Sequence, residues 1–582
     1  MPDLTGLRRH IPANSLLLLL VAGLIGLPVL TVAAHVFLPS EGSWAHLATT
    51  VLPGYAMNSL WLLVGVGTGT LILGTGTAWL ATMYVFPGRR LFEWALILPL
   101  AAPAYVLAYA YTDFLDVAGP VQGLLRAMTG WQASDYGFPP IRSLGGAIAI
   151  FIFALYPYVY LAARAAFLEQ GAVVLEAGRT LGCTPRRAFR RIALPMARPA
   201  LAAGVALALM ETLADFGAVS YFGVQTFTTG IYRTWFSLGD RVAAAQLASL
   251  LLAVIALLLF AERASRRRAR YFETSRRTRR LAAQPLGGWR GWIAAAVCAM
   301  PLVLGFLLPA GILLSLAIDG GVAAIGARYP EMVRNSLTLA ALTAGLAVAI
   351  ALALSYGVRV GQSAAGRLAV RLASLGYAIP GSIIAVGVLI PLARLDNALD
   401  AVMRESFGIS TGLLLTGSIA ALVFAYLVRF LALAQQTVGA GLERITPAMD
   451  AAAATLGAGP RRALFAVHLP MLRGPLLTAI LMVFVEVMKE LPATMIMRPF
   501  NYETLAVQAH NLASDERLAE AAVPALTIVA VGLAPVFLLS RLIGRPGPGR
   551  RRNLLPPQLR AMADAVRGRN AQPPPPRAAE GP

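Results

Sequence analysis

The sequence predicts an all-α polytopic membrane protein with about twelve transmembrane helices, arranged as two parallel repeats of about six helices each. Three observations predict this fold class: long apolar runs recur along the chain, one motif-rich pattern occurs twice, and basic residues gather in alternate loops. The chain has 582 residues, of which 58% are hydrophobic and 13% are charged. A soluble protein of this length has no use for so many apolar runs.

The apolar runs are each about 20 residues long, enough to cross a hydrocarbon core of ~30 Å. The first run follows Arg8 and Arg9, as in a signal peptide, but it is too long for one and more runs follow. We therefore expect an uncleaved first helix. The expected spans are residues 14–38, 55–85, 91–112, 143–163, 199–220, 242–261, 291–318, 334–358, 368–393, 411–434, 474–496 and 518–540.

The net charge of +21 is explained by membrane topology. With the N-terminus in the cytoplasm, most of the 49 lysines and arginines fall on the cytoplasmic side, chiefly in residues 164–198, 263–290, 429–473 and 541–582. This bias is the positive-inside rule, so we expect both termini in the cytoplasm and no nucleic-acid partner. The two cysteines, Cys183 and Cys298, form no disulfide or metal pattern, and we expect no cofactor bound by this chain.

One basic stretch occurs twice. "RTLGCTPRRAFRRIALP" begins at Arg179, and "ATLGAGPRRALFAVHLP" begins 275 residues later at Ala454. Further landmarks keep nearly the same offset: Asn58 with Asn335, Pro103 with Pro380, and Glu211 with Glu486. Such a shared spacing indicates an internal duplication. We expect a first repeat at 1–262, a basic cytoplasmic linker at 263–290, a second repeat at 291–541 and a disordered Pro/Arg-rich tail at 542–582.

Each copy of the stretch predicts a helix–turn–helix at the cytoplasmic membrane surface. A glycine interrupts the first helix, a proline starts the second, and another proline closes it. These are Gly182, Pro185 and Pro195 in the first copy, and Gly457, Pro460 and Pro470 in the second. A lone stretch of this kind is typical of an interfacial helix held by anionic lipid. Two copies favour a pair of equivalent docks for a dimeric partner.

Acidic residues occur inside the fifth span of each repeat. Glu211 and Glu486 lie about a dozen residues into these spans, at a depth of ~18 Å. Asp215 and Glu490 follow at i+4, where we expect them on the same helical face, and Lys489 lies within ion-pairing reach of Glu486. Buried charges in a bilayer usually face a cavity or a partner.

The helices are expected to break just after these acids, at Gly217 and Pro492. Two interpretations remain open. Either the charges form an ion-pair contact that joins the helices of the two halves, or they line a translocation pathway in which carboxylates bind a hard cation.

The repeated stretch resembles a known motif. In "EAGRTLGCTPRRAFRRIALP", the pattern E-A-x-x-x-x-L-G, then P, then I-x-L-P resembles the EAA loop of binding-protein-dependent ABC importer permeases. The second copy departs from it, with Ala451 in place of Glu176 and Asp450 one position earlier. The segments Pro103–Gln122 and Glu486–Ala522 resemble the ferric-iron subgroup, whose permease is often a fused chain.

This resemblance implies a type I, MetI-like permease in a bacterial inner membrane. It implies an ABC ATPase dimer at the two EAA loops (residues 176–195 and 450–470), and a periplasmic iron-binding protein on the other side. Implied docking residues are Glu176, Ala177, Gly182, Pro185, Arg186, Leu194 and Pro195, and then Asp450, Gly457, Pro460, Arg461, Leu469 and Pro470. Independently of the resemblance, the buried charges give the expected pathway residues Glu211, Asp215, Glu486, Lys489 and Glu490, with transient Fe3+ contacts at the four acids if they line the pathway.

The chain has no ATP-binding P-loop of its own. That motif needs a lysine followed by serine or threonine, and the one lysine here, Lys489, is followed by Glu490. We therefore expect a translocation subunit that is not an enzyme. The alternatives are a fused permease for thiamine, polyamine or phosphonate, a proton-coupled secondary transporter that uses the buried acids as a relay, and a membrane scaffold.

Overall fold

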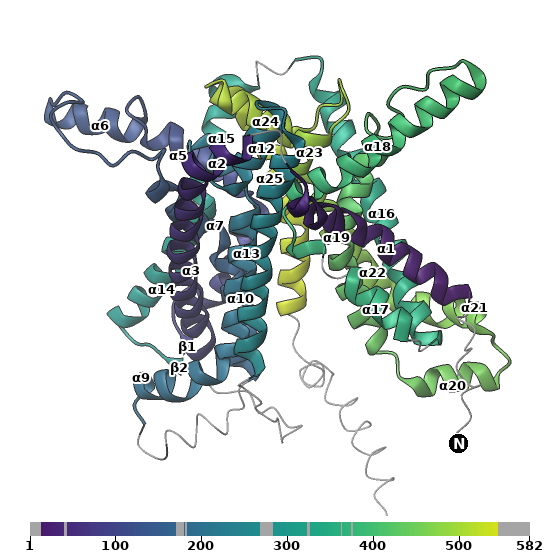
Figure 1. The fold of residues 1–582 in the computed structure, drawn as a ribbon. Coiled ribbons are helices and arrows are strands. Elements are labelled where there is room, and N and C mark those ends of the chain that lie inside the picture. Colours follow the sequence, from purple (N-terminus) through teal and green to yellow (C-terminus); the bar gives the residue numbers. More distant parts are fainter. Residues whose placement is uncertain are drawn as a thin grey trace, which may run out of the picture. The chain divides into compact units, whose positions relative to one another are not determined.

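The computed structural model describes residues 13–39, 43–169, 180, 183–267, 283–322, 326–361, 364–373 and 376–544. Residues Met1–Val536 form one compact unit, and Phe537–Pro582 form a second. The described part of the first unit consists almost wholly of helices (Figure 1). All of the predicted disordered tail after Gly544, and most of the predicted basic linker, lie outside the described residues.

The elements follow the chain in two similar series. The first series is α1 (Ala13–Ala34), η2 (His35–Phe37), α2 (Ser43–Thr50), α3 (Leu52–Met83), β1 (Tyr84–Val85), α4 (Arg89–Ala95), η3 (Leu98–Ala101), α5 (Ala104–Leu115), α6 (Pro120–Thr129), α7 (Leu144–Glu169), α9 (Pro185–Ala188), η4 (Phe189–Ala193), α10 (Leu194–Ala214), α11 (Gly217–Tyr221), α12 (Phe227–Phe236) and α13 (Arg241–Arg267). The second series is β2 (Gln284–Pro285), α14 (Trp289–Leu302), η5 (Val303–Leu307), α15 (Leu308–Leu316), η6 (Ala317–Gly321), α16 (Tyr329–Gly361), α17 (Ala364–Ala373), η7 (Gly376–Ala378), α18 (Gly381–Phe407), α19 (Ile419–Glu443), α20 (Pro447–Thr455), α21 (Pro460–Ala463), η8 (Leu464–His468), α22 (Leu469–Met488), α23 (Pro492–Met497), α24 (Leu505–Ser514) and α25 (Leu518–Gly544).

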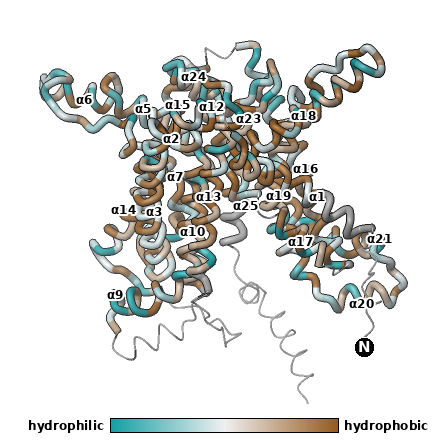
Figure 2. The backbone as a smooth tube through the Cα atoms, in the orientation of Figure 1, coloured by the Kyte–Doolittle hydropathy of each residue, from teal (hydrophilic) through white to brown (hydrophobic). Residues whose placement is uncertain are grey.

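The predicted all-α polytopic fold is confirmed. Among the described residues, ten helices are long and apolar enough to cross a membrane, and a bent pair (Arg89–Ala101 with Ala104–Thr129) makes an eleventh candidate. The first expected span coincides with α1, a helix of 22 residues that is not among these ten; its region contributes a shorter apolar helix, Gly23–Phe37. Figure 2 shows hydrophobic residues concentrated along the helices and hydrophilic residues in the connecting loops.

Three long helices pack together in each series. In the first, α3, α7 and α10 contact one another; in the second, α16, α19 and α22 do the same. Glycine allows the close approach in the first series. A Cβ atom on Gly74 would lie 2.7 Å from Cβ of Val159, and one on Gly204 would lie 2.9 Å from Cα of the same valine. Small residues at such crossings let helix backbones meet in a membrane.

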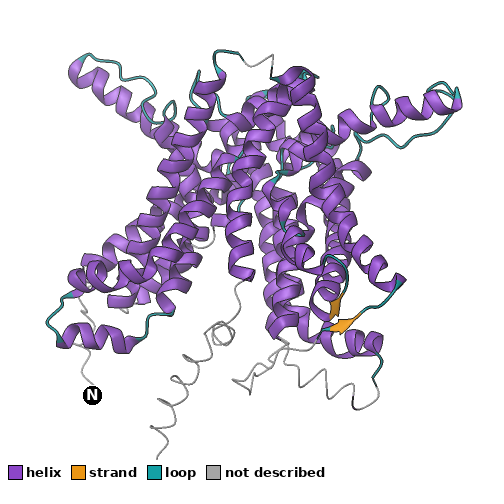
Figure 3. Ribbon diagram, turned by 180° about the vertical axis from the view of Figure 1, so that it is seen from behind, coloured by secondary structure: helices purple, strands orange, loops and turns teal. Residues whose placement is uncertain are grey.

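The first helix of each series packs mainly on the other series. Helix α1 contacts α17 and α18, while α14 contacts α3 and α4, and α15 contacts α5. A short parallel pairing of β1 with β2, seen in Figure 3, adds a second connection between the two series. The two halves are therefore held together by exchanged helices as well as by direct contact.

The prediction that Pro195 and Pro470 close a short helix is wrong. Each proline continues the helix, because the turn before it is a π-helical turn, η4 or η8. The widened turn closes with the Leu194 N–H bonded to the Phe189 carbonyl, and the Leu469 N–H to the Leu464 carbonyl. A π turn inserts one extra residue into the ladder, so the proline that follows fits into the helix although it has no N–H to donate.

Candidate translocation cavity and docking surfaces

The two acid-bearing helices break at equivalent places. Helix α10 ends at Ala214 and α11 starts at Gly217, while α22 ends at Met488 and α23 starts at Pro492. The sequence predicts breaks at these positions, and this prediction agrees with the structure.

The acids after each break cap the next short helix. Asp215 accepts backbone hydrogen bonds from Ala218 at 2.9 Å and Val219 at 3.2 Å. Glu490 accepts them from Ala493 at 3.0 Å and Thr494 at 3.1 Å. The expectation that Asp215 and Glu490 continue one helical face with Glu211 and Glu486 is therefore wrong, because the helix has already ended and the acids bind the free N–H groups of the next one.

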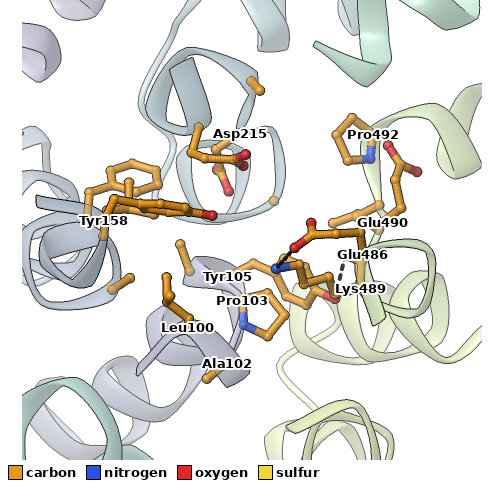
Figure 4. Close-up of a pocket in the computed structure, with 18 of the residues that line it drawn as sticks. Leu100, Ala102, Pro103, Tyr105, Tyr158, Asp215, Glu486, Lys489, Glu490 and Pro492 are labelled. Atoms are coloured by element: carbon orange, nitrogen blue, oxygen red, sulfur yellow. Dashed lines mark hydrogen bonds and ion pairs between the residues drawn. The ribbon is translucent and has the colours of Figure 1, made fainter. Parts of the chain in front are cut away.

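Residues from both series line one cavity of about 100 Å³ (Figure 4). The first series contributes the α5 start with Tyr105, the α7 residue Tyr158, and two carboxylates, Glu211 and Asp215. The second series contributes Arg429, Phe430, Glu486, Lys489, Glu490, Leu491 and Pro492. The structure thus brings together all five predicted pathway residues.

The charges in this cavity are unequally paired. Lys489 Nζ lies 2.8 Å from Glu486 Oε1, as the i,i+3 spacing predicts. Glu490, whose side chain is 1% exposed, pairs with Arg429 at 2.9 Å and also accepts from the Thr494 hydroxyl at 2.8 Å. Within the described part of the chain, Glu211 and Asp215 have no basic side chain within 4.0 Å. The cavity therefore keeps two carboxylates without a cationic partner.

Arg429 is a site residue that the sequence analysis missed. It was assigned to the start of a cytoplasmic loop, but α19 runs from Ile419 to Glu443 and carries Arg429 in its interior. Its side chain is only 11% exposed. Two features of the sequence pointed to it. Arg429 lies inside an apolar run, and the fifth span of the same repeat carries two acids but only one lysine, so one acid needs another cation.

The second predicted dock is well described. Helix α20 ends at Thr455, Leu456 caps it, Gly457 follows with a φ of +75°, and Pro460 opens α21, as the motif predicts. The dock exposes Arg461 together with two large apolar side chains, Leu456 at 84% and Phe465 at 68%. Leu469 and Pro470 lie at the start of α22.

Asp450 turns inward from the second dock. It binds Arg359 at 2.7 Å and His468 at 2.8 Å. Partial burial disfavours its charge, but the hydrogen bonds from Arg359 and His468 outweigh this effect and lower the pKa of Asp450 below its ordinary value.

The first predicted dock is described only in part. Glu176, Ala177 and Gly182 lie outside the described residues. Pro185 opens α9, as predicted, and the π turn that follows carries the exposed Arg190 and Arg191. The backbone of Arg186 lies in α9, and Leu194 and Pro195 begin α10.

Comparison with known proteins places this architecture in a family. Residues 70–271 match the model of the binding-protein-dependent transport system inner membrane component. The sulfate transport system permease protein CysT of Salmonella typhimurium is 31% identical over 194 residues, which are 32% of this chain and 67% of that protein. The chain belongs to this permease family. The relatives described here are permease subunits, and the chain is a multi-pass inner-membrane protein.

Other relatives cover more of the chain or carry other names. The Fe(3+)-transport system permease protein FbpB 2 of Haemophilus influenzae is 26% identical over 488 residues, covering 83% of this chain and 89% of that protein. This long alignment confirms the predicted resemblance to a fused ferric-iron permease. A putative 2-aminoethylphosphonate permease protein, PhnU of Salmonella choleraesuis, is 28% identical over 30% of this chain and 61% of its own length.

Proposed function

We propose that this permease imports ferric iron across a bacterial inner membrane, driven by ATP that a separate subunit hydrolyses. The cavity between the two series carries the proposal, because two of its carboxylates, Glu211 and Asp215, line a space that both halves share and form no ion pair within 4.0 Å among the described residues. Carboxylate oxygens suit a hard trivalent cation. The alignment with the Haemophilus influenzae protein over 83% of the chain points to the same substrate.

We propose one partner for the cytoplasmic side of the protein and one for the periplasmic side. An ABC ATPase dimer would bind the docks around α9 and α21 in the cytoplasm, where both termini would lie. A periplasmic iron-binding protein would deliver the ion on the opposite side. Closure of the ATPase dimer would move the docks and reorient the two series around the cavity.

A second candidate is import of an oxyanion, because relatives named for sulfate and 2-aminoethylphosphonate align with the chain. The cavity argues against it. Its two cations, Arg429 and Lys489, are each engaged by a carboxylate of the same cavity. An oxyanion would find four carboxylates there and no free cation among the described lining residues.

The test compares uptake by cells that carry the native chain with uptake by cells that carry Glu211→Gln together with Glu486→Gln. We expect uptake of radioactive ferric iron to fall about tenfold or more, which corresponds to a loss of ~1.4 kcal/mol, while the ATPase still co-purifies. The matched control is Glu331→Gln, at an exposed pair on α16 that is 3.9 Å long. Unchanged iron uptake in the double variant removes these acids from the pathway.

Substrate and energy source need two further arms. Uptake of radioactive sulfate or 2-aminoethylphosphonate by the native chain, with no uptake of iron, would favour the oxyanion importer. An uncoupler that stops uptake while the ATPase is absent would favour the proton-coupled transporter. Loss of uptake on ATPase depletion alone supports the proposed importer.

A further inference from the structure

The second dock is tied to the membrane helices by a network that joins four elements. Arg359 lies near the end of α16, Asp450 on α20, and His468 at the end of η8, just before α22. Arg359 donates to Asp450 Oδ2 through Nε at 2.9 Å and Nη2 at 2.7 Å. His468 Nε2 lies 2.8 Å from Asp450 Oδ1, so both carboxylate oxygens are occupied.

The same side chains also bind the backbone. Arg359 donates to the carbonyls of Leu442 and Ile445, both at 2.7 Å, where α19 ends. His468 Nδ1 lies 3.0 Å from the Ala463 carbonyl, at the end of α21. One turn earlier on α16, the Tyr356 hydroxyl donates to the Pro460 carbonyl at 2.6 Å, which fixes the first residue of α21.

The three side chains of this network differ in exposure: His468 is 2% exposed, Arg359 is 19% exposed and Asp450 is 39% exposed. Hydrogen bonds to charged groups are about twice as strong as neutral ones. A displacement of α20 and α21 must therefore move α16, α19 and α22 with them, or else break several charged hydrogen bonds.

The first series carries other residues at the corresponding sequence positions, and its own acid, Glu176, lies outside the described residues. The residues that correspond to Tyr356 and Arg359, 277 positions earlier, are Trp79 and Thr82. Trp79 instead packs on Phe189 at 4.7 Å and on Phe167 at 5.3 Å between ring centroids. Asp450 and His468 correspond, at the 275-residue offset, to Leu175 and Ala193 in the sequence. Ring packing has no fixed donor geometry, so it constrains orientation less than this polar network does.

We propose that Arg359, Asp450 and His468 are positioning residues that make the second dock a rigid lever, through which movement of the ATPase reaches the helices around the cavity. Asp450 thus serves the dock from within and is not its contact with the partner. The inference rests on the proposed function, because it takes α20 and α21 to be an ATPase dock.

The test follows movement at the cavity independently of the transported substrate. In a chain with Cys183→Ser and Cys298→Ala, the change Ala214→Cys places one thiol in the cavity lining. The complex with its co-purified ATPase is treated with a maleimide, with and without ATP and vanadate. When Arg359, Asp450 and His468 are unchanged, we expect ATP and vanadate to change the labelling rate at least about fivefold, the lower end of typical coupling.

The informative variants are Asp450→Asn and Arg359→Gln, with Arg359→Lys as a milder change that keeps the charge but cannot make all four bonds. Each should retain the ATPase while the ATP-dependent change in labelling falls below about twofold. The matched control is Thr82→Ala, the position equivalent to Arg359 in the first series, and it should behave like the native chain.

Three outcomes would overturn the inference. If Asp450→Asn and both Arg359 variants keep the ATP-dependent change in labelling rate that the native chain shows, the network of Arg359, Asp450 and His468 does not transmit motion. If Asp450→Asn releases the ATPase and Arg359→Lys does not, Asp450 contacts the partner directly. If the native chain retains no ATPase at all, the proposed function fails, and the inference fails with it.

Discussion

Tyr109 of α5 and His510 of α24 are joined by a hydrogen bond of 2.8 Å, although 401 residues separate them. Both side chains are buried, and the bond links the first series to the second. Nearby, Arg142 and Glu516 form a second bond between the series, with paired contacts of 2.8 and 2.9 Å. The first contact joins α5 to α24, and the second joins the loop after α6 to the loop after α24.

Removing the Tyr109 hydroxyl should destabilise this junction. Tyr109→Phe keeps the ring but leaves His510 without its partner, and an unpaired buried polar group costs about 1–3 kcal/mol. We expect a lower unfolding temperature in detergent, measured by the fluorescence of a thiol-reactive dye. Tyr136→Phe, which loses its bonds to Gln122 at 2.9 Å and Arg126 at 3.1 Å within the first series, is the control and should shift the temperature less. Equal shifts would show that the contact between the series adds no more stability than these partly exposed bonds within one series.

The Arg142–Glu516 pair predicts a pH dependence of stability. The hydrogen bond from Arg142 lowers the pKa of Glu516 below its ordinary value of 4.5. A lowered pKa means that the pair stabilises the folded protein above pH 4.5 and that this contribution is lost as the pH falls through the lower folded value. The difference in unfolding temperature between the native chain and Glu516→Gln should therefore be constant at neutral pH and shrink in acid. A difference that grows in acid would contradict the sign.

The Arg429–Glu490 pair should be one of the costliest to break. Arg429→Met leaves Glu490 buried without its cation, and removing one partner of a buried pair costs about 3–5 kcal/mol. Adding Glu490→Gln should recover part of the loss, and a double-mutant cycle of unfolding free energies measures the coupling. Arg334→Met, at an exposed pair of 3.9 Å, is the control and should cost at most about 1 kcal/mol. Additive effects of the two cavity changes would show that the pair is not coupled.

Two glycines on α3 should respond differently to alanine. Gly74→Ala places a Cβ atom 2.7 Å from Cβ of Val159 and 2.9 Å from the Tyr156 carbonyl oxygen on α7, so the helices must separate. Gly76→Ala meets no atom within 4 Å. We expect the first change to destabilise the protein by about 1–3 kcal/mol, the usual cost of overpacking. The second should be neutral or stabilising by up to about 1 kcal/mol, because alanine is the better helix former. Unfolding temperatures of the two variants, compared side by side, check this, and equal values would contradict the close approach of α3 and α7.

The local features of the site were predictable from the sequence. The Glu486–Lys489 pair follows from its spacing along one helix, and the breaks after Ala214 and Met488 follow from the glycine and proline beside them. The role of Asp215 and Glu490 was not predictable in this way. Extending the helical period past the break put them on the wrong face, because the period no longer applies once the helix ends.

The sequence alone determined that this chain crosses the membrane many times and carries one pattern twice. Both properties depend on local composition, since the bilayer sets the length of each apolar run and a duplication preserves spacing.

Only the tertiary structure decided which distant charges meet: Arg429 with Glu490, Arg359 with Asp450, and Tyr109 with His510. It also decided that Pro195 and Pro470 lie within continuous helices, and that α1 packs on the opposite series. For the three polar pairs the physical reason is the same. A buried polar group requires a partner, but the partner's identity depends on how helices far apart in the chain are packed, and hydropathy and spacing carry no record of that packing.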